Sequence, residues 1–165
     1  MRKALAAIGS AIFLVIVPGF VAVLAPRWIS GWHFLPPFLG LNLFRFAGGI
    51  LIVMGVAGLL ECFARFALCG LGTPAPVFPT RHLVITGMYR YVRNPMYLAV
   101  AATIFGQALL FGSVALVEYG ALVWLLFHLF VLLYEEPRLR ATFGAEYTEF
   151  CARVPRWIPT FRQRF

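Results

Sequence analysis

Four long apolar runs alternate with short polar segments along this chain of 165 residues. They cover about residues 4–25, 41–68, 95–110 and 114–134. A helix needs about 20 apolar residues to cross the roughly 30 Å of hydrocarbon in a bilayer, and three of the runs reach that length. The third run is shorter and joins the fourth through the tight turn Phe111-Gly112-Ser113. The pattern predicts an all-α integral membrane protein with about four transmembrane helices, the last two forming a hairpin.

The first run raises a question of processing. Val23-Leu24-Ala25 resembles a signal-peptide cleavage site, but Pro26 would directly follow the cut. Because the run is also long enough to span the bilayer, we interpret it as an uncleaved transmembrane helix that ends near Ala25. Residues 26–40, with Trp28 and Trp32, are expected to form a connector at the level of the headgroups.

Two polar clusters flank the expected hairpin. Residues 81–97 are rich in arginine and tyrosine, and Glu135-Glu136-Pro137-Arg138 follows the fourth run. Asn94-Pro95 predicts a helix start, because asparagine is a favoured cap and proline at the first helical position sacrifices no hydrogen bond. A hairpin returns the chain to its starting side, so both clusters should lie at one membrane face.

The tail after the fourth run is amphipathic. Its apolar residues recur at helical spacing while its charges lie mainly elsewhere; they are Leu139, Phe143, Tyr147 and Phe150. This spacing predicts an interfacial C-terminal helical segment that lies along the membrane and that Gly144 breaks into two pieces. The segment is either a passive anchor or a lid over a cytoplasmic site.

Composition changes the picture from apolar segments to a membrane class. The chain is 62% hydrophobic with a mean hydropathy of +0.87, and 12% of its residues are charged, about half the share of a soluble domain. We expect one domain over residues 1–165, with two spans in residues 1–70 and the loop, hairpin and tail in residues 71–165.

The net charge of +8 gives an orientation. Lysine and arginine concentrate before the first run, between the second and third runs, and after the fourth. The positive-inside rule therefore predicts that both termini and both polar clusters are cytoplasmic. Topology and anionic headgroups explain the basic charge, so we expect no nucleic-acid partner.

Several polar residues fall within or near the apolar runs. Glu61 and Arg65 stand four apart in the order that favours an ion pair, and a functional role at membrane depth is the alternative. Gly48, Gly55 and Gly58 recur near one helix face, which should allow close helix packing.

His128 shares a helical stripe with Trp124 and Glu135. It either forms a hydrogen bond inside the bundle or lines a site. His82, in the loop, is expected to face solvent or phosphate. The cysteines show no metal-ligand spacing, so no metal site is predicted; they are Cys62, Cys69 and Cys151.

Four ordered segments of the C-terminal half resemble the superfamily of isoprenylcysteine carboxyl methyltransferases and phospholipid methyltransferases. They are residues 87–97 (GMYRYVRNPMY), 134–137 (YEEP), 143–147 (FGAEY) and 154–156 (VPR). The resemblance covers about residues 80–160. It implies an integral membrane enzyme that uses S-adenosylmethionine, and likeness to the bacterial branch implies a bacterial inner membrane.

The resemblance also implies a site. In this superfamily the cofactor lies in a cytoplasmic pocket formed by the loop before the penultimate span, the last hairpin and the C-terminal segment. Lipophilic substrates arrive from the bilayer. Carried over by motif, the cofactor-binding residues are Tyr89, Arg93, Asn94, Tyr97, Glu135, Glu136, Tyr147 and Pro155. The carboxyl methyltransferases usually have histidine where this chain has Asn94, so a carboxylate, an amine and a thiol all stay open as acceptors.

The chemistry of these side chains agrees with that reading. Arg93 can bind a carboxylate, the two glutamates can pair with an ammonium group or a ribose, and tyrosines can stack on adenine. Arg93, Glu135 and His128 are the candidate catalytic residues. An amine acceptor would need a base, and Glu135, Glu136 or His128 could serve.

The acceptor is expected to be a lipophilic or amphiphilic molecule that approaches sideways, through an apolar opening between the glycines of the second run and the phenylalanine-rich faces of the third and fourth runs. The alternatives to a methyltransferase are a non-catalytic membrane scaffold or small-molecule carrier and, with less support, a quinone- or haem-binding protein.

Overall fold

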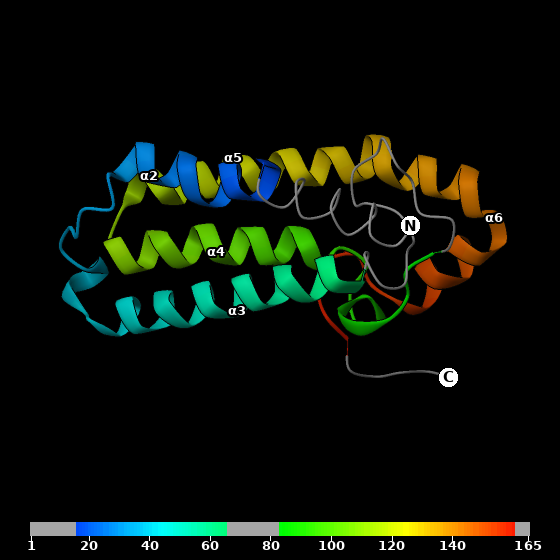
Figure 1. The fold of residues 1–165 in the computed structure, drawn as a ribbon, viewed down its shortest axis with the longest axis horizontal. Coiled ribbons are helices and arrows are strands. Elements are labelled where there is room, and N and C mark those ends of the chain that lie inside the picture. The colour runs from blue at the N-terminus through cyan, green and yellow to red at the C-terminus, as the bar shows by residue number, and fades with distance from the viewer. Residues whose placement is uncertain (1–15, 66–82, 161–165) are drawn as a thin grey trace, which may run out of the picture.

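The computed structural model describes residues 16–65 and 83–160, and these residues form helices and loops with no strand. Figure 1 shows long helices side by side, with α6 and the loop before α4 at one end. The prediction of an all-helical chain is confirmed for this part. The elements in order are η1 (Phe20–Leu24), α2 (Ala25–Ser30), η2 (Phe38–Gly40), α3 (Leu43–Arg65), η4 (Gly87–Arg90), α4 (Pro95–Phe111), α5 (Val114–Phe130), η5 (Val131–Glu135) and α6 (Glu136–Arg153).

Two of these helices are long and apolar enough to cross a membrane. They are α3 and the continuous helix Val114–Arg153 that α5, η5 and α6 form together. Ile16–Ser30 and α4 are shorter apolar helices. The predictions for residues 4–15, for Cys69 and for His82 fall outside the described residues.

The hairpin of α4 and α5 has the predicted turn. Gly112 ends α4 with φ at +68°, a left-handed conformation that glycine adopts without strain. Ser113 Oγ then accepts a hydrogen bond from the backbone N–H of Leu116 at 3.3 Å and caps α5. The turn therefore reverses the chain within the three residues that the sequence indicated.

Helices α3 and α4 are packed closely, as the glycines of α3 predicted. A Cβ atom on Gly48 would lie 2.6 Å from the backbone O of Gly106, and one on Gly55 would lie 2.7 Å from the backbone O of Ala99. The two backbones thus touch where side chains are absent. The apolar opening expected beside these glycines is wrong, because α4 fills the space.

The predicted end of the first helix at Ala25 is also wrong. The helix continues through Pro26 to Ser30, where Gly31 ends it with φ at +58°. A proline normally breaks a helix because it has no N–H group and its ring crowds the preceding turn. Here the turn before it widens into the π-helix η1, in which the N–H of Ala25 bonds to the backbone O of Phe20.

Pro26 has no backbone N–H to offer, and two side chains from neighbouring helices donate instead to carbonyl groups of the turn before it. Gln107 Nε2, on α4, donates to the backbone O of Ala22 at 2.7 Å. The Tyr119 hydroxyl, on α5, donates to the backbone O of Val21 at 2.9 Å. An unpaired carbonyl is costly inside a bilayer, so these two contacts allow the helix to pass the proline.

The fourth apolar run shows the same arrangement at its C-terminal end. A helix end was expected near Tyr134, but the π-helix η5 leads directly into α6. The N–H of Glu136 bonds to the backbone O of Val131, and Pro137 follows. The helix therefore carries Glu135 and Glu136 beyond the apolar run without a break. Gly144 bends α6 with φ at +53°, in agreement with the predicted division of the tail.

Candidate functional site

The loop before α4 is seated on the end of α3. Gly87 begins η4 with φ at +64°, and a Cβ there would lie 2.8 Å from Arg65 Nε. Arg65 Nε donates to Glu61 Oε1 at 2.8 Å, so the predicted ion pair of Glu61 and Arg65 is confirmed. Its place against Gly87 supports the structural interpretation, since the pair positions the loop.

Asn94 acts differently from its prediction. Pro95 takes the first position of α4 as expected, but the Asn94 side chain makes no capping hydrogen bond, so its predicted role as a cap is wrong. Its Nδ2 instead donates to the backbone O of Arg156 at 3.2 Å. The amide is therefore used to hold a distant part of the chain.

That part is the segment of residues 154–160, which we call the C-terminal strap. Two backbone hydrogen bonds join it to the loop: the N–H of Arg93 donates to the O of Pro155 at 2.9 Å, and the N–H of Thr160 donates to the O of Tyr91 at 3.0 Å. Together with the Asn94 amide they bring the end of the chain back against the start of α4.

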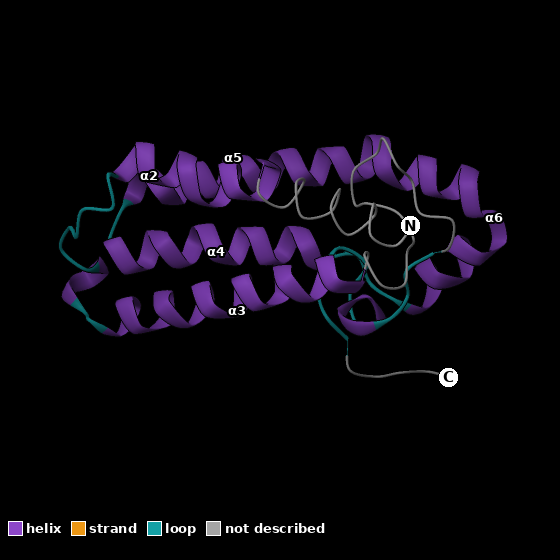
Figure 2. Ribbon diagram, in the orientation of Figure 1, coloured by secondary structure: helices purple, strands orange, loops and turns teal. Residues whose placement is uncertain are grey.

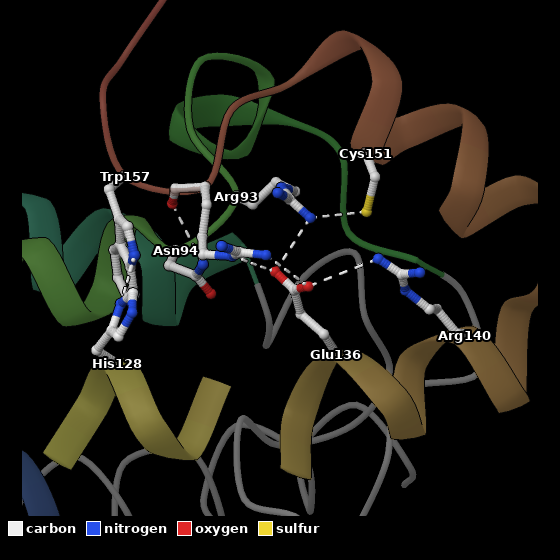
Figure 3. A network of polar contacts seen from close by, with 8 residues as sticks. Arg93, Asn94, His128, Glu136, Arg140, Cys151 and Trp157 are labelled. Atoms are coloured by element: carbon white, nitrogen blue, oxygen red, sulfur yellow. Dashed lines mark hydrogen bonds and ion pairs between the residues drawn. The ribbon is translucent and has the colours of Figure 1, made fainter. Parts of the chain in front are cut away.

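Glu136 lies at the centre of an arginine cluster (Figure 3). Arg156, on the strap, binds it in a bidentate way, with Nε 2.6 Å from Oε1 and Nη2 3.0 Å from Oε2. Arg93 Nη1 is 3.1 Å from Oε1, and Arg140 Nη2 is 3.8 Å from Oε2. Glu136 is only 5% exposed, so the loop, the strap and α6 meet at one buried carboxylate.

The arginines determine the charge of this carboxylate. Burial alone would raise the pKa of Glu136, but the hydrogen bond from Arg156 and the charges of Arg93, Arg156 and Arg140 hold it below its usual value. The same hydrogen bond raises the pKa of Arg156. Both groups are therefore charged at neutral pH, and the pair acts as a fixed ionic centre.

Arg93 has hydrogen-bonding capacity left over. Its Nη1 also donates to Cys151 Sγ at 2.7 Å, on α6. Its Nε is buried and has no hydrogen-bond partner among the described residues. A buried guanidinium N–H without a partner is unfavourable in the protein alone. This donor is available to a bound group with an acceptor oxygen.

Glu135 does not take part in the arginine cluster that surrounds Glu136. The Tyr97 hydroxyl, on α4, donates to Glu135 Oε2 at 2.7 Å. The π-helix η5 ends at Glu135, and such an insertion changes the direction in which the next side chains leave the helix. Consecutive glutamates thus face α4 and the arginine cluster, respectively.

His128 bonds to the strap. Trp157 Nε1 donates to His128 Nδ1 at 3.0 Å, and the indole also packs on Trp124 with ring centroids 4.5 Å apart. Because Nδ1 is the acceptor, a neutral imidazole here carries its hydrogen on Nε2. The prediction that His128 and Trp124 share a stripe is consistent with their common contact with Trp157.

The remaining predicted residues lie around this centre. Tyr89 is buried in an apolar cluster with Cys62 and Val84. Tyr147 is 3% exposed, and burial together with the Cys151 thiol raises its pKa, so its hydroxyl is neutral. Pro155 contributes its backbone O to Arg93. The structure thus joins Arg93 directly to Glu136 and Pro155, ties Asn94 to the strap at Arg156, and pairs Tyr97 with Glu135.

Four contributors were not selected from the sequence: Arg140, Cys151, Arg156 and Trp157. Arg156 stands among several basic residues of the tail that the positive-inside rule already explains. The only signal for it was its place directly after Pro155 in a segment of the resemblance. Nothing in the spacing of Trp157 or Cys151 distinguished them from interfacial and packing residues.

Comparison with known proteins agrees with this architecture. The sequence profile of the phospholipid methyltransferase family matches residues 43–146, from the start of α3 into α6. The chain is also similar to protein-S-isoprenylcysteine O-methyltransferase B of Arabidopsis thaliana, with 32% identity over 78 residues. That stretch covers 47% of this chain and 39% of the relative, so less than half of either protein is aligned. Since the family profile covers more than half of the chain, this protein belongs to the phospholipid methyltransferase family.

Proposed function

We propose that this protein transfers the methyl group of S-adenosylmethionine to a lipophilic acceptor at the cytoplasmic face of a bacterial inner membrane, with both termini cytoplasmic. Enzymes of this family use S-adenosylmethionine, and the acceptors that the family implies are of lipid type. The observation that carries the proposal is the cluster that Arg93 and Arg156 form around the buried carboxylate of Glu136. It forms where the segment matched by the family meets the C-terminal strap.

The residues of the cluster fit the cofactor. Arg93 Nε is a buried donor without a partner among the described residues, and a carboxylate is its natural acceptor. Glu136 offers the opposite charge next to it, which suits an ammonium group or a ribose. We propose that Arg93, Asn94, Glu136 and Pro155 hold the cofactor from the centre of the cluster. Tyr89, Tyr97, Glu135 and Tyr147 complete the site around them.

S-adenosylmethionine supplies, when bound, an electrophilic methyl group that a carboxylate, a thiolate or a neutral amine can attack. The residues of the chain then have two tasks: to orient the acceptor and, for an amine, to take up its proton. Glu135 is the better placed base, because among the described residues its carboxylate accepts a hydrogen bond from the neutral hydroxyl of Tyr97 and forms no ion pair with an arginine. Arg93 binds a carboxylate and thereby orients the molecule that carries it.

His128 has a different role in this proposal. Its Nδ1 is already an acceptor for Trp157, and its other nitrogen then carries a hydrogen when the ring is neutral. The ring therefore serves to position Trp157. Lateral access next to α3 does not remain, since the glycines of α3 are packed against α4. We propose that the acceptor approaches along α4 and α5 instead.

Binding and turnover test the proposal separately. The detergent-purified protein is titrated with S-adenosylhomocysteine, and saturable binding is expected. It is then incubated with methyl-labelled S-adenosylmethionine and three probes: N-acetyl-S-farnesylcysteine, vesicles of dioleoylphosphatidylethanolamine, and a total membrane lipid extract. The first offers a carboxylate on an isoprenylcysteine, as in the name of the relative, and the second offers an amine on a phospholipid, as in the name of the family.

Label in any lipid-soluble product supports the proposed reaction, and the chemical structure of that product identifies the acceptor group. Saturable binding with no labelled product from any probe would favour a non-catalytic carrier. Absence of binding would favour a scaffold. Methylation of water-soluble compounds alone would reject the lipophilic acceptor.

A further inference from the structure

An aromatic cluster lies beside the charged residues, and its two tryptophans have no part in the chemistry described so far. Its centre is Trp157, which packs on Trp124 and donates its N–H to His128 (Figure 3). The Tyr97 ring meets the same indole edge-on, with centroids 6.5 Å apart. Tyr97 also packs on Phe127 at 4.8 Å. The cluster therefore joins the strap to both α4 and α5.

Trp157 belongs to the tail but contacts a residue well inside the fourth apolar run. His128 stands six residues before Tyr134, the end of the fourth apolar run, which corresponds to about 9 Å along a helix. The strap thus returns from the cytoplasmic side and places a half-buried indole at the depth of the spanning hairpin. Indole suits such a boundary because it is largely apolar with one N–H donor.

Tyr97 marks the border between the two clusters. Its hydroxyl faces Glu135, whereas its ring contacts Trp157 and Phe127. An acceptor from the bilayer must bring its reacting head to the polar side of this tyrosine. The apolar part next to that head then comes to lie on the other side, against the ring of Trp157.

We propose that Trp157 is a specificity-determining residue that contacts the apolar portion of the acceptor next to its reacting group, and that His128 is the positioning residue that fixes the indole. The proposal rests on the proposed methyl transfer. Arg156, the residue before Trp157, binds Glu136, so the indole is held at a fixed position relative to the proposed cofactor site. The same strap therefore serves both ligands.

The test compares substitutions at the cluster with a matched tryptophan elsewhere. Trp157→Leu removes the ring, and Trp157→Phe keeps an aromatic ring without the N–H. His128→Leu removes the acceptor of the indole N–H, and His128→Gln restores an acceptor. Trp28→Leu is the control, because Trp28 is 71% exposed and lies on α2 at the opposite end of the bundle.

Each variant is assayed with methyl-labelled S-adenosylmethionine and the total membrane lipid extract, and the labelled products are separated by mass spectrometry. We expect Trp157→Leu to raise the apparent KM for the extract about 10-fold, the scale on which apolar pockets discriminate, and to change the proportions of the products. The affinity for S-adenosylhomocysteine should stay as in the wild type. His128→Leu should shift the same quantities in the same direction, and His128→Gln should restore them.

Two results would overturn the inference. One is an unchanged KM and product pattern in Trp157→Leu. The other is a parallel loss of S-adenosylhomocysteine binding and turnover in every cluster variant, Trp157→Phe included, since the strap would then only support the cofactor site. A wild-type protein that labels no lipid would reject the proposed function first, and that failure is visible before any variant is compared.

Discussion

Glu136 and Glu149 both pair with arginine, but their surroundings give the two pairs different weight. Glu136 is 5% exposed and faces three guanidinium groups. Glu149 pairs with Arg153 on the surface of α6, where both side chains are more than half exposed. Water screens the surface pair, whereas neutralising the buried carboxylate leaves buried positive charge without compensation.

We therefore expect Glu136→Gln to lower the free energy of unfolding by about 3 kcal/mol and to weaken S-adenosylhomocysteine binding. Unfolding of the detergent-solubilised protein and equilibrium titration would measure the two effects. Glu149→Gln is the matched control and should change the free energy by less than about 1 kcal/mol. Equal losses of unfolding free energy in the two variants would show that the ion pairs of Glu136 stabilise the protein no more than a surface pair does.

Site residues could be predicted where a motif supplied them. Arg93, Asn94, Glu136 and Pro155 were selected from segments of the resemblance, and they meet in the structure. The partners that the strap provides could not be predicted, because a basic and aromatic tail fits membrane anchoring equally well. Asn94 shows a related limit, since its amide can cap a helix or hold another segment, and only tertiary contacts decide.

At the scale of the element, hydropathy located the helices but not their ends. The second and third apolar runs agree with α3 and α4 within the described residues, because length and polarity decide whether a segment can span a bilayer. Helix ends were expected at Ala25 and Tyr134, where the apolar runs end, and a proline lies shortly after each. In each case a π-helix precedes the proline by two residues and the helix continues. The groups that permit this at Pro26 come from α4 and α5, far away in the sequence.

This explanation predicts a coupled effect of two substitutions. Gln107→Leu leaves the backbone O of Ala22 without its donor, which should cost about 1–3 kcal/mol. Pro26→Ala restores a backbone N–H that can bond to that oxygen, so Gln107→Leu should cost less in the Pro26→Ala background. Thermal unfolding of the four proteins in detergent measures the coupling.

The same comparison is made with Tyr119→Phe, with and without Pro26→Ala, since Tyr119 donates to the neighbouring carbonyl of Val21. Simple additivity in both sets would mean that the side chains do not substitute for the missing N–H.

The glycines of α3 allow a comparison between adjacent positions. A Cβ on Gly48 would lie 2.6 Å from backbone atoms of α4, whereas Gly49 has nothing within 4 Å of such an atom. We expect Gly48→Ala to destabilise the protein, because backbone cannot move aside as a flexible side chain can. Gly49→Ala should be neutral or stabilising by up to about 1 kcal/mol through its helix propensity. Loss of stability at both positions alike would contradict close packing of α3 on α4.

At the scale of the whole molecule, the two ends of the bundle differ in chemistry. The arginine cluster, the strap and the loop before α4 gather at one end. The other end holds the turn at Gly112 and the connector before α3, where the N–H of Leu35 bonds to the backbone O of Phe111 at 2.9 Å. The fold thus brings the predicted polar clusters to one end, and the positive-inside rule predicts that this end faces the cytoplasm.

That orientation gives the last prediction, which decides whether the proposed site can meet a cofactor made in the cytoplasm. Single cysteines are introduced at exposed positions in a background of Cys62→Ala, Cys69→Ala and Cys151→Ser. A membrane-impermeant maleimide should label Leu39→Cys and Val114→Cys in intact cells, since these residues are 84% and 59% exposed at the end without the arginine cluster. Ile85→Cys and Ile158→Cys, which are 47% and 79% exposed at the other end, should react only after the cells are permeabilised. The reason is that arginines near span ends stay on the cytoplasmic side during insertion.

The background without an introduced cysteine controls for labelling of other groups, and labelling after solubilisation shows that each cysteine is reactive. Labelling of Ile85→Cys or Ile158→Cys in intact cells would put the cluster outside and would remove the basis for cofactor binding there.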